Sequence, residues 1–235
     1  MAITPSPFHP HETRLPGVTP EYRAARDRLQ AAEIELMRQR EAVAERRRAL
    51  PPGPAVTDYT FLAGPPHLDQ GDLPVQPVQL SALFSGPGRP LIVYHFMYGK
   101  AQTSPCPMCT LWIDGFNGVA HHVQRNADFA IVSAADPEQL REHARRRGWH
   151  RLRLLSCGAN SFMYDLGSED EAGHQDSTVS VFTQDPDGTV RHRYSARPRL
   201  DADLTERGID LLSPVWHLLD LTPAGRGEWY PSLDY

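Results

Sequence analysis

The sequence has few cysteines, a single lysine and no long apolar run. Three cysteines are an odd number and too few for the disulfide framework of a small secreted protein. The longest strongly apolar run, LIVYHFM, is too short to cross a bilayer, and the first residues lack the basic and apolar regions of a signal peptide. We therefore expect a cytoplasmic protein with no membrane partner.

The charge balance gives no general reason to expect a polyanionic partner. The chain carries 24 Lys and Arg against 29 Asp and Glu, a net charge of −5, so we expect no nucleic acid partner. A length of 235 residues with 40% hydrophobic and 23% charged residues suits one folded domain with an extension.

The N-terminal part differs in composition from the rest of the chain. Residues 1–20 are proline-rich and predict an irregular arm. Residues 21–50 contain neither Gly nor Pro and predict an amphipathic helix that ends before the sequence PPGP. We expect its apolar face to pack on the chain's own domain or on a sister subunit, and the second case predicts a homodimer through residues 21–48. That face consists of Ala25, Leu29, Ala32, Leu36 and Val43, with Gln39 as a polar gap.

Residues 51–235 alternate between strand and helix patterns, which predicts one α/β domain. PLIVYHFMYG and ADFAIVSAA read as buried strands, and a helix is expected after each, over about 106–125 and from Asp136. Strand–helix–strand connections imply parallel pairing. The turn DPDG between STVSVFTQ and TVRHRYS predicts an antiparallel hairpin.

The connecting segments are less regular. TDYTFLAG and VQPVQLSALF read as short edge strands or loops, and RLRLLS as a further short strand. SFMYDLGSEDEAGHQD, residues 161–176, is expected to be a long polar loop. LTERGIDLLSPVWHLLDL predicts a closing helix that restarts at Ser213 and Pro214.

Two of the three cysteines stand two residues apart in CPMC, at the start of a predicted helix. Unpaired amides and aligned peptide dipoles at a helix N-terminus stabilise a thiolate, and in such motifs cysteine pKa values fall to roughly 3.5 to 7.5. We therefore predict Cys106 as the attacking thiol. Cys109 lies one turn further along, on the apolar stripe, and is expected to resolve the mixed disulfide. Pro107 suits the first helical turn, where no amide donor is needed.

Other interpretations of the motif remain open. A CxxC pair can be half of a zinc site, but a second CxxC is missing, and the adjacent His121 and His122 are not expected to place both rings on one helical face. The chain can also be a non-catalytic binding or assembly module, or bind a metal or haem through Cys106. Cys157 and His95, both in apolar surroundings, are expected to be buried structural residues, and Lys100 an exposed loop residue.

Several segments resemble a known family. The order of strand, CPMC helix, strand and hairpin resembles the thioredoxin-like superfamily on its peroxiredoxin side. More narrowly, YHFMYG, CPMCTLWIDGFNG, MYDLG and HLLDLTPAGR resemble the DUF899 family, to which dithiol–disulfide oxidoreductase activity is ascribed. The resemblance covers about residues 20–230. It implies a thioredoxin-like three-layer α/β sandwich with a central mixed sheet and an N-terminal helical extension.

The resemblance also implies site residues and a reaction. It places Cys106 and Cys109 at the family's CPxC position, with a supporting or substrate-binding role expected for Thr103, Ser104, Pro107, Trp112 and Thr178. Thr178 lies where thioredoxins carry a cis-proline that binds a substrate backbone, which favours a small-molecule disulfide or peroxide over a protein. We expect a dithiol oxidoreductase or thiol peroxidase recycled by a cellular thiol reductant, with no cofactor and no metal.

Overall fold

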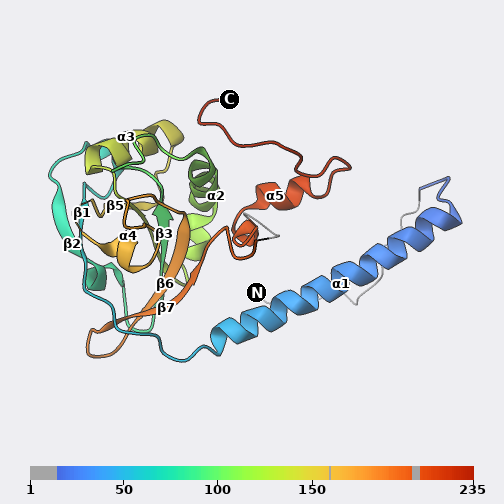
Figure 1. Ribbon diagram of the computed structural model, residues 1–235, viewed down its shortest axis with the longest axis horizontal. Coiled ribbons are helices and arrows are strands. Elements are labelled where there is room, and N and C mark those ends of the chain that lie inside the picture. The colour runs from blue at the N-terminus through green and yellow to red at the C-terminus, as the bar shows by residue number, and fades with distance from the viewer. Residues whose placement is uncertain (1–14, 159, 203–206) are drawn as a thin grey trace. The chain divides into compact units, whose positions relative to one another are not determined.

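The computed structural model describes residues 15–158, 160–202 and 207–235 (Figure 1). The chain divides into two compact units, Met1–Leu50 and Pro51–Tyr235. Of the irregular arm expected over residues 1–20, residues 1–14 lie outside the described part of the chain.

The first unit contains the predicted N-terminal helix. Helix α1 spans Pro20–Arg48, and its first turn is capped by Thr19, whose hydroxyl accepts a hydrogen bond from the amide of Tyr22 at 3.2 Å. Three arginines in the last turn face the negative end of the helix dipole. None of the 29 residues of α1 is buried in the chain.

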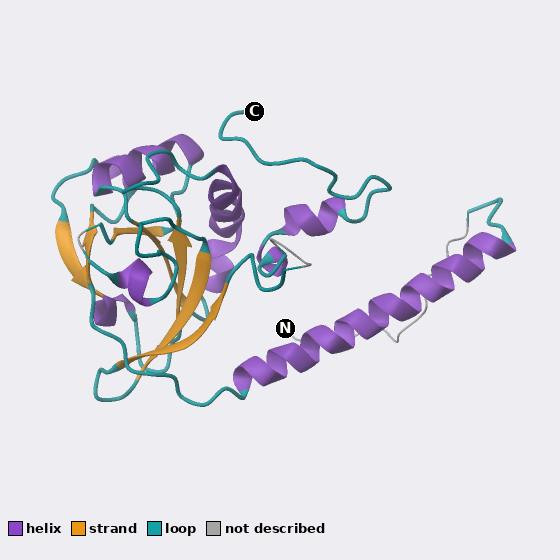
Figure 2. Cartoon of the chain, in the orientation of Figure 1, coloured by secondary structure: helices purple, strands orange, loops and turns teal. Residues whose placement is uncertain are grey.

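The second unit is built on a seven-stranded mixed sheet with the order β2-β1-β5-β4-β3-β6-β7. Figure 2 draws its strands in orange. The strands are β1 (Thr60–Ala63), β2 (Gln76–Gln79), β3 (Leu91–Phe96), β4 (Asp128–Ser133), β5 (Arg153–Ser156), β6 (Thr178–Gln184) and β7 (Val190–Ala196).

Parallel strands occupy the centre of this sheet. β3 pairs in parallel with β4, and β4 with β5, through α2 (Pro107–Val123) and α3 (Pro137–Arg147). On its other side β3 pairs antiparallel with β6, which forms the predicted hairpin with β7. Both helical crossovers step in the same direction across the sheet, so with the usual right-handed connection both helices lie on one face.

The two faces of the sheet carry separate cores. One core joins inward residues of α2 and α3 to Tyr94 and Phe96 of β3, and the other joins Val93 to α4 (Phe162–Asp165) and to the 3₁₀ turn Leu80–Leu83. The layers are therefore α2 with α3, the sheet, and α4 with short turns. This confirms the predicted thioredoxin-like three-layer α/β fold.

The prediction of a long polar loop over residues 161–176 was wrong at its start. Residues Phe162–Asp165 form α4, and Phe162 is fully buried, with its ring centroid 5.2 Å from Tyr59 and 5.0 Å from Phe61. Because a run of polar residues follows it, this short apolar turn is not evident from the sequence pattern. The turn covers the face of the sheet opposite α2.

The predicted closing helix is shorter than its sequence pattern. A 3₁₀ turn at Asp210–Leu212 precedes α5 (Pro214–Leu219), and Ser213 caps α5 by accepting from the amide of Val215 at 3.4 Å. The expected restart at Ser213 and Pro214 is present. Residues 203–206, where the pattern began, lie outside the described part of the chain.

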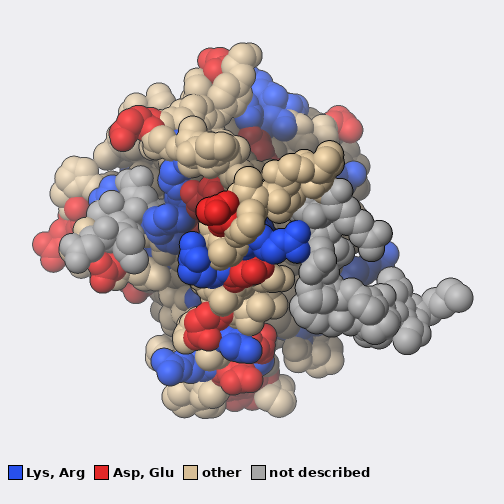
Figure 3. Space-filling view, turned by 90° about the vertical axis from the view of Figure 1, so that its right-hand side faces the viewer, with Lys and Arg blue, Asp and Glu red and all other residues tan. Residues whose placement is uncertain are grey.

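Positive and negative side chains are interspersed on the face of the molecule shown in Figure 3. Within the described ranges, no helix combines the length and the apolar character needed to cross a membrane.

Candidate active site

The loop that leaves the central strand places Cys106 at the N-cap of α2. The Cys106 amide donates to the carbonyl of Met97 at 3.1 Å, just after β3 ends, and Pro107 follows as the first helical residue. The Cys106 carbonyl accepts from Thr110 at 2.9 Å, the first hydrogen bond of the helix. The Cys106 sulfur lies outside the helix and accepts from the amide of Cys109 at 3.4 Å.

This position lowers the pKa of Cys106 to about 7. The largest cause is a hydrogen bond from the side chain of Cys109, opposed by burial, which raises the pKa. The amides of Cys109 and Met108 and the side chain of Tyr230 lower it further. Donors therefore surround the sulfur on several sides, and a large share of Cys106 is thiolate at neutral pH.

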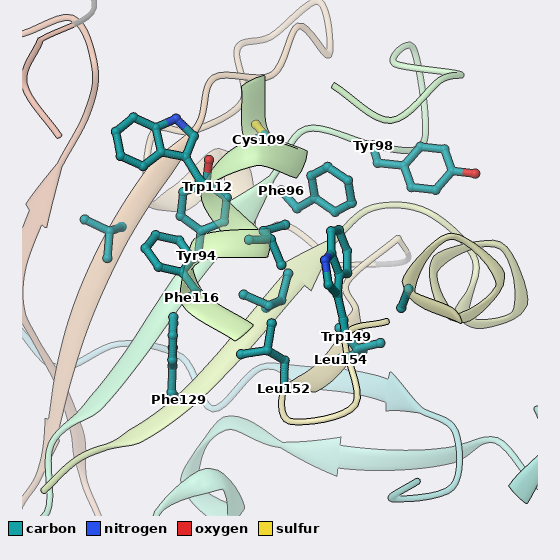
Figure 4. Packing of buried hydrophobic residues seen from close by; sticks show 14 of the residues in the cluster. Tyr94, Phe96, Tyr98, Cys109, Trp112, Phe116, Phe129, Trp149, Leu152 and Leu154 are labelled. Atoms are coloured by element: carbon teal, nitrogen blue, oxygen red, sulfur yellow. The ribbon is translucent and has the colours of Figure 1, made fainter. Parts of the chain in front are cut away.

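Cys109 has the opposite electrostatic environment. It is 1% exposed, and burial raises its pKa well above the usual range, as do the hydrogen bond to Cys106 and the charge on Cys106. The side chain of Tyr94 opposes this in part, and its hydroxyl points to the end of the core cluster at which Cys109 lies (Figure 4). The two thiols are therefore unequal, with Cys106 the acidic one.

A cavity of about 630 Å³ borders both cysteines. Its walls come from the start of α2, from the segment 167–177 that follows α4, and from the C-terminal segment 198–230. Aromatic side chains of Trp112, Trp216 and Trp229 line it together with charged residues. The site is thus a concave pocket with a nucleophile at its wall, large enough for a small molecule.

The structure brings three of the predicted site residues together. Cys106, Cys109 and Trp112 line the cavity, and Pro107 starts the helix beside them without lining it. Trp112 is 1% exposed, and its indole nitrogen has no hydrogen-bond partner among the residues that the structure describes.

The other predicted residues lie apart from the cavity. Thr103 and Ser104 are exposed and do not line it. Thr178 is fully buried in β6, opposite His95 of β3, and it is the preceding Ser177 that lines the cavity.

Sequence reasoning missed the contribution of the C-terminal segment. Tyr230 lines the cavity together with Cys106, more than a hundred residues away in the chain, and its side chain is one of the groups that lower the pKa of Cys106. Arg226 lies over the ring of Trp216, 5.0 Å from its centroid, and Trp229 packs on that ring at 5.7 Å. The cluster of aromatic residues near the C-terminus was the signal available, but nothing in it indicates which site it joins.

Three further residues named in the sequence analysis, Cys157, His95 and Lys100, do not line the cavity. Cys157 is buried, which raises its pKa to about 12. His95 is fully buried, with its Nδ1 2.6 Å from the Ser168 hydroxyl, and burial lowers its pKa to about 3. The Lys100 ammonium pairs with Glu169 at 2.8 Å.

The metal interpretation can be compared with the side-chain arrangement. Over the parts of the chain that the structure describes, no three His, Cys, Asp or Glu side chains come together as a set of metal ligands.

Comparison with known proteins places the chain in a sequence family. The family described as "Bacterial protein of unknown function (DUF899)" matches residues 14–235. No curated protein sequence gave a match.

The chain is also similar to solved structures of low sequence identity. A PrxQ mutant from Xylella fastidiosa is 12% identical, with 69% of this chain and 93% of that chain covered and a TM-score of 0.48. AhpC from Enterococcus faecalis is 14% identical, with 68% and 87% covered and a TM-score of 0.47. Mycobacterium bovis AhpC is 17% identical, with 77% and 98% covered and a TM-score of 0.45.

Proposed function

The chain belongs to the DUF899 family, and we propose that it is a thiol–disulfide oxidoreductase in which Cys106 attacks and Cys109 resolves. The observation that carries the proposal is the placement of the Cys106 sulfur. It lies at the N-cap of α2, 3.4 Å from the Cys109 amide, at the wall of a cavity of about 630 Å³. A thiolate that is both stabilised and next to a pocket can meet a substrate.

The reaction with a disulfide has two exchange steps. The Cys106 thiolate attacks one sulfur of the substrate, the substrate S–S bond breaks, and one half leaves as a thiolate. Cys109 then loses its proton and attacks the Cys106 sulfur, which releases the other half as a thiolate and forms the Cys106–Cys109 disulfide. A cellular dithiol returns two electrons and two protons, and the enzyme is regenerated.

A hydroperoxide would lead to the same oxidised enzyme. The Cys106 thiolate attacks the terminal peroxide oxygen, the O–O bond breaks, and the alkoxide takes up a proton and leaves as an alcohol. The resulting Cys106 sulfenic acid is attacked by Cys109, which loses its proton, and water leaves. Recycling again requires an external dithiol, and this requirement favours the cytoplasm as the compartment.

The unequal thiols suit this order of events. The charge on Cys106 is one of the causes that raise the pKa of Cys109. That charge is lost once Cys106 is joined to substrate, so Cys109 becomes easier to deprotonate at the moment it must attack.

Cavity size and the β6 segment support a small substrate. A volume of about 630 Å³ lies within the range of small-molecule sites, and Thr178 is buried within β6 where thioredoxins carry a proline that binds a substrate backbone. We therefore propose a small-molecule disulfide or a peroxide as the oxidant.

Substrate consumption with matched variants tests the proposal. Purified protein is incubated with dithiothreitol as reductant and either hydroxyethyl disulfide or hydrogen peroxide, and substrate loss is followed against a protein-free control. We expect the wild type to accelerate at least one reaction, Cys106→Ser to abolish the acceleration, and Cys157→Ser to retain it. No acceleration of either reaction would contradict the proposal and favour a non-catalytic binding module.

A further inference from the structure

Helix α1 exposes a regular apolar stripe along its length. Tyr22, Leu29, Leu36 and Val43 recur every seven residues, and all four are between 40% and 57% exposed. Ala25 and Ala32 stand between them, so the 3-4 spacing is that of the a and d positions of a coiled coil. A helix that buries no residue lacks the tertiary packing that supplies most of the stability of helices in proteins.

The charges that flank the stripe indicate which partner fits. With Tyr22 at position a, the g and e' positions that meet in a parallel, in-register pair of identical helices can be read from the sequence. They join Glu21 to Arg26', Arg28 to Glu33', and Glu35 to Arg40', where the prime marks the second helix. All three pairs are of opposite charge, all six side chains are exposed, and two-fold symmetry doubles each pair.

We propose that α1 pairs with α1 of a second copy of this chain as a parallel, in-register two-stranded coiled coil. An antiparallel pair would place e against e' and g against g'. With the helix ends aligned, Arg26 would lie next to Arg47' and Glu35 next to Glu35', and only Glu33 and Arg40' would attract. The parallel arrangement avoids this repulsion, so the charges select orientation as well as partner. The polar residues Gln39 and Arg46 occupy the last two d positions, so the apolar stripe is widest over the first half of α1.

Oligomeric state measured on the full chain tests this pairing. Light scattering after size exclusion should give twice the chain mass of 26.3 kDa. Leu36→Glu should give a monomer, whereas Met37→Glu, at the neighbouring and more exposed position on another face, should remain a dimer. A monomeric wild type, or a dimer that survives Leu36→Glu, would overturn the proposal.

A charge swap tests the orientation. Glu35→Arg or Arg40→Glu alone turns two attractive pairs into repulsive ones and should weaken the dimer roughly tenfold, and the double variant should restore it. If the single variants leave the dissociation constant unchanged, or if the double variant fails to restore it, the parallel register is wrong.

A second inference concerns residues 221–235, which follow α5 and are tied to the rest of the domain on both sides of Tyr230. Before Tyr230, Arg226 bonds Asp210 at 2.8 Å and Asp220 at 3.0 Å. After it, the carbonyl of Leu233 accepts from Arg147 at 2.9 Å. Trp229 adds a ring contact to Trp216. Residues 226–230 are therefore held at the cavity although they form no helix or strand.

The phenol of Tyr230 is suited to bind the Cys106 thiolate. Tyr230 and Cys106 line the same cavity, the Tyr230 side chain is one of the groups that lower the pKa of Cys106, and a phenol remains protonated at neutral pH and can donate. We infer that Tyr230 is a thiolate-binding residue of the active site, donating its hydroxyl proton to the Cys106 sulfur. This inference rests on the proposed function, because it assigns a partner to the proposed nucleophile.

The pH dependence of Cys106 alkylation tests the proposed function and the role of Tyr230 separately. Tyr230→Phe keeps the ring and should move the midpoint upward by about half a pH unit, whereas Tyr235→Phe, another hydroxyl in the same segment, should leave it unchanged. A wild-type midpoint near that of free cysteine, about 8.5, would contradict the proposed function itself. A low wild-type midpoint that Tyr230→Phe leaves unchanged would overturn only the role of Tyr230.

Discussion

Replacing Cys109 with Ala removes the side chain that contributes most to the acidity of Cys106. Four donor interactions hold the pKa of Cys106 at about 7, against a usual 9.0 and despite the opposing effect of burial. The Cys109 side chain is the largest of the four, and the amides of Cys109 and Met108 remain in the variant. We expect Cys109→Ala to raise the pKa of Cys106 to about 8, which lowers its thiolate fraction at neutral pH from about one half to about one tenth.

The assay is iodoacetamide alkylation over a pH series, with the modified residue located by mass spectrometry. The midpoint is the quantity to compare, because a more basic thiolate is intrinsically more reactive and offsets part of the loss in rate. Cys109→Ser is the matched control, since its hydroxyl can still donate and should keep the midpoint near that of the wild type. An unchanged midpoint in Cys109→Ala would refute the reasoning that the second thiol activates the first.

Two further predictions concern the stability of the domain. Phe162→Ala should lower the free energy of unfolding by about 3–5 kcal/mol in urea denaturation, since Phe162 is fully buried among aromatic rings, whereas the exposed Tyr164→Ala should cost under about 1 kcal/mol. Burial lowers the pKa of His95 to about 3 and of His143 to about 4, so both are neutral in the folded state and gain protons on unfolding below their usual 6.5. Stability should therefore fall by about 4 kcal/mol from pH 7 to pH 5, and equal stability at the two values would contradict this.

Much of the architecture could be predicted from local patterns. The apolar run that became β3 and the DPDG turn of the β6–β7 hairpin are signals carried by consecutive residues, and alternating strands and helices imply parallel pairing. CPMC at a predicted helix start likewise located Cys106 at the N-cap of α2. Each of these features is determined by residues close together in the chain.

The features that were missed depend on contacts between distant segments. Residues 161–176 contain only a short apolar turn, and Phe162 is buried because of rings contributed by β1 and the residue before it, Tyr59. Tyr230 is held at the cavity beside Cys106 by flanking contacts with Arg147 and Trp216 that no local pattern reveals. Thr178 illustrates the reverse case, since its neighbour Ser177 takes the place at the cavity. Successive side chains of a strand point to opposite faces of the sheet, and only the pairing register determines which of two neighbouring residues faces the cavity.

The central claim, that Cys106 attacks and Cys109 resolves, is tested most directly by mapping the products of a single turnover. Reduced protein is mixed with one equivalent of hydroxyethyl disulfide, quenched with acid and analysed by mass spectrometry. The wild type should lose two hydrogens and contain a Cys106–Cys109 disulfide with Cys157 still reduced, and Cys109→Ser should stop with the adduct on Cys106. An adduct on Cys109 or Cys157, or no reaction at Cys106, would contradict the account.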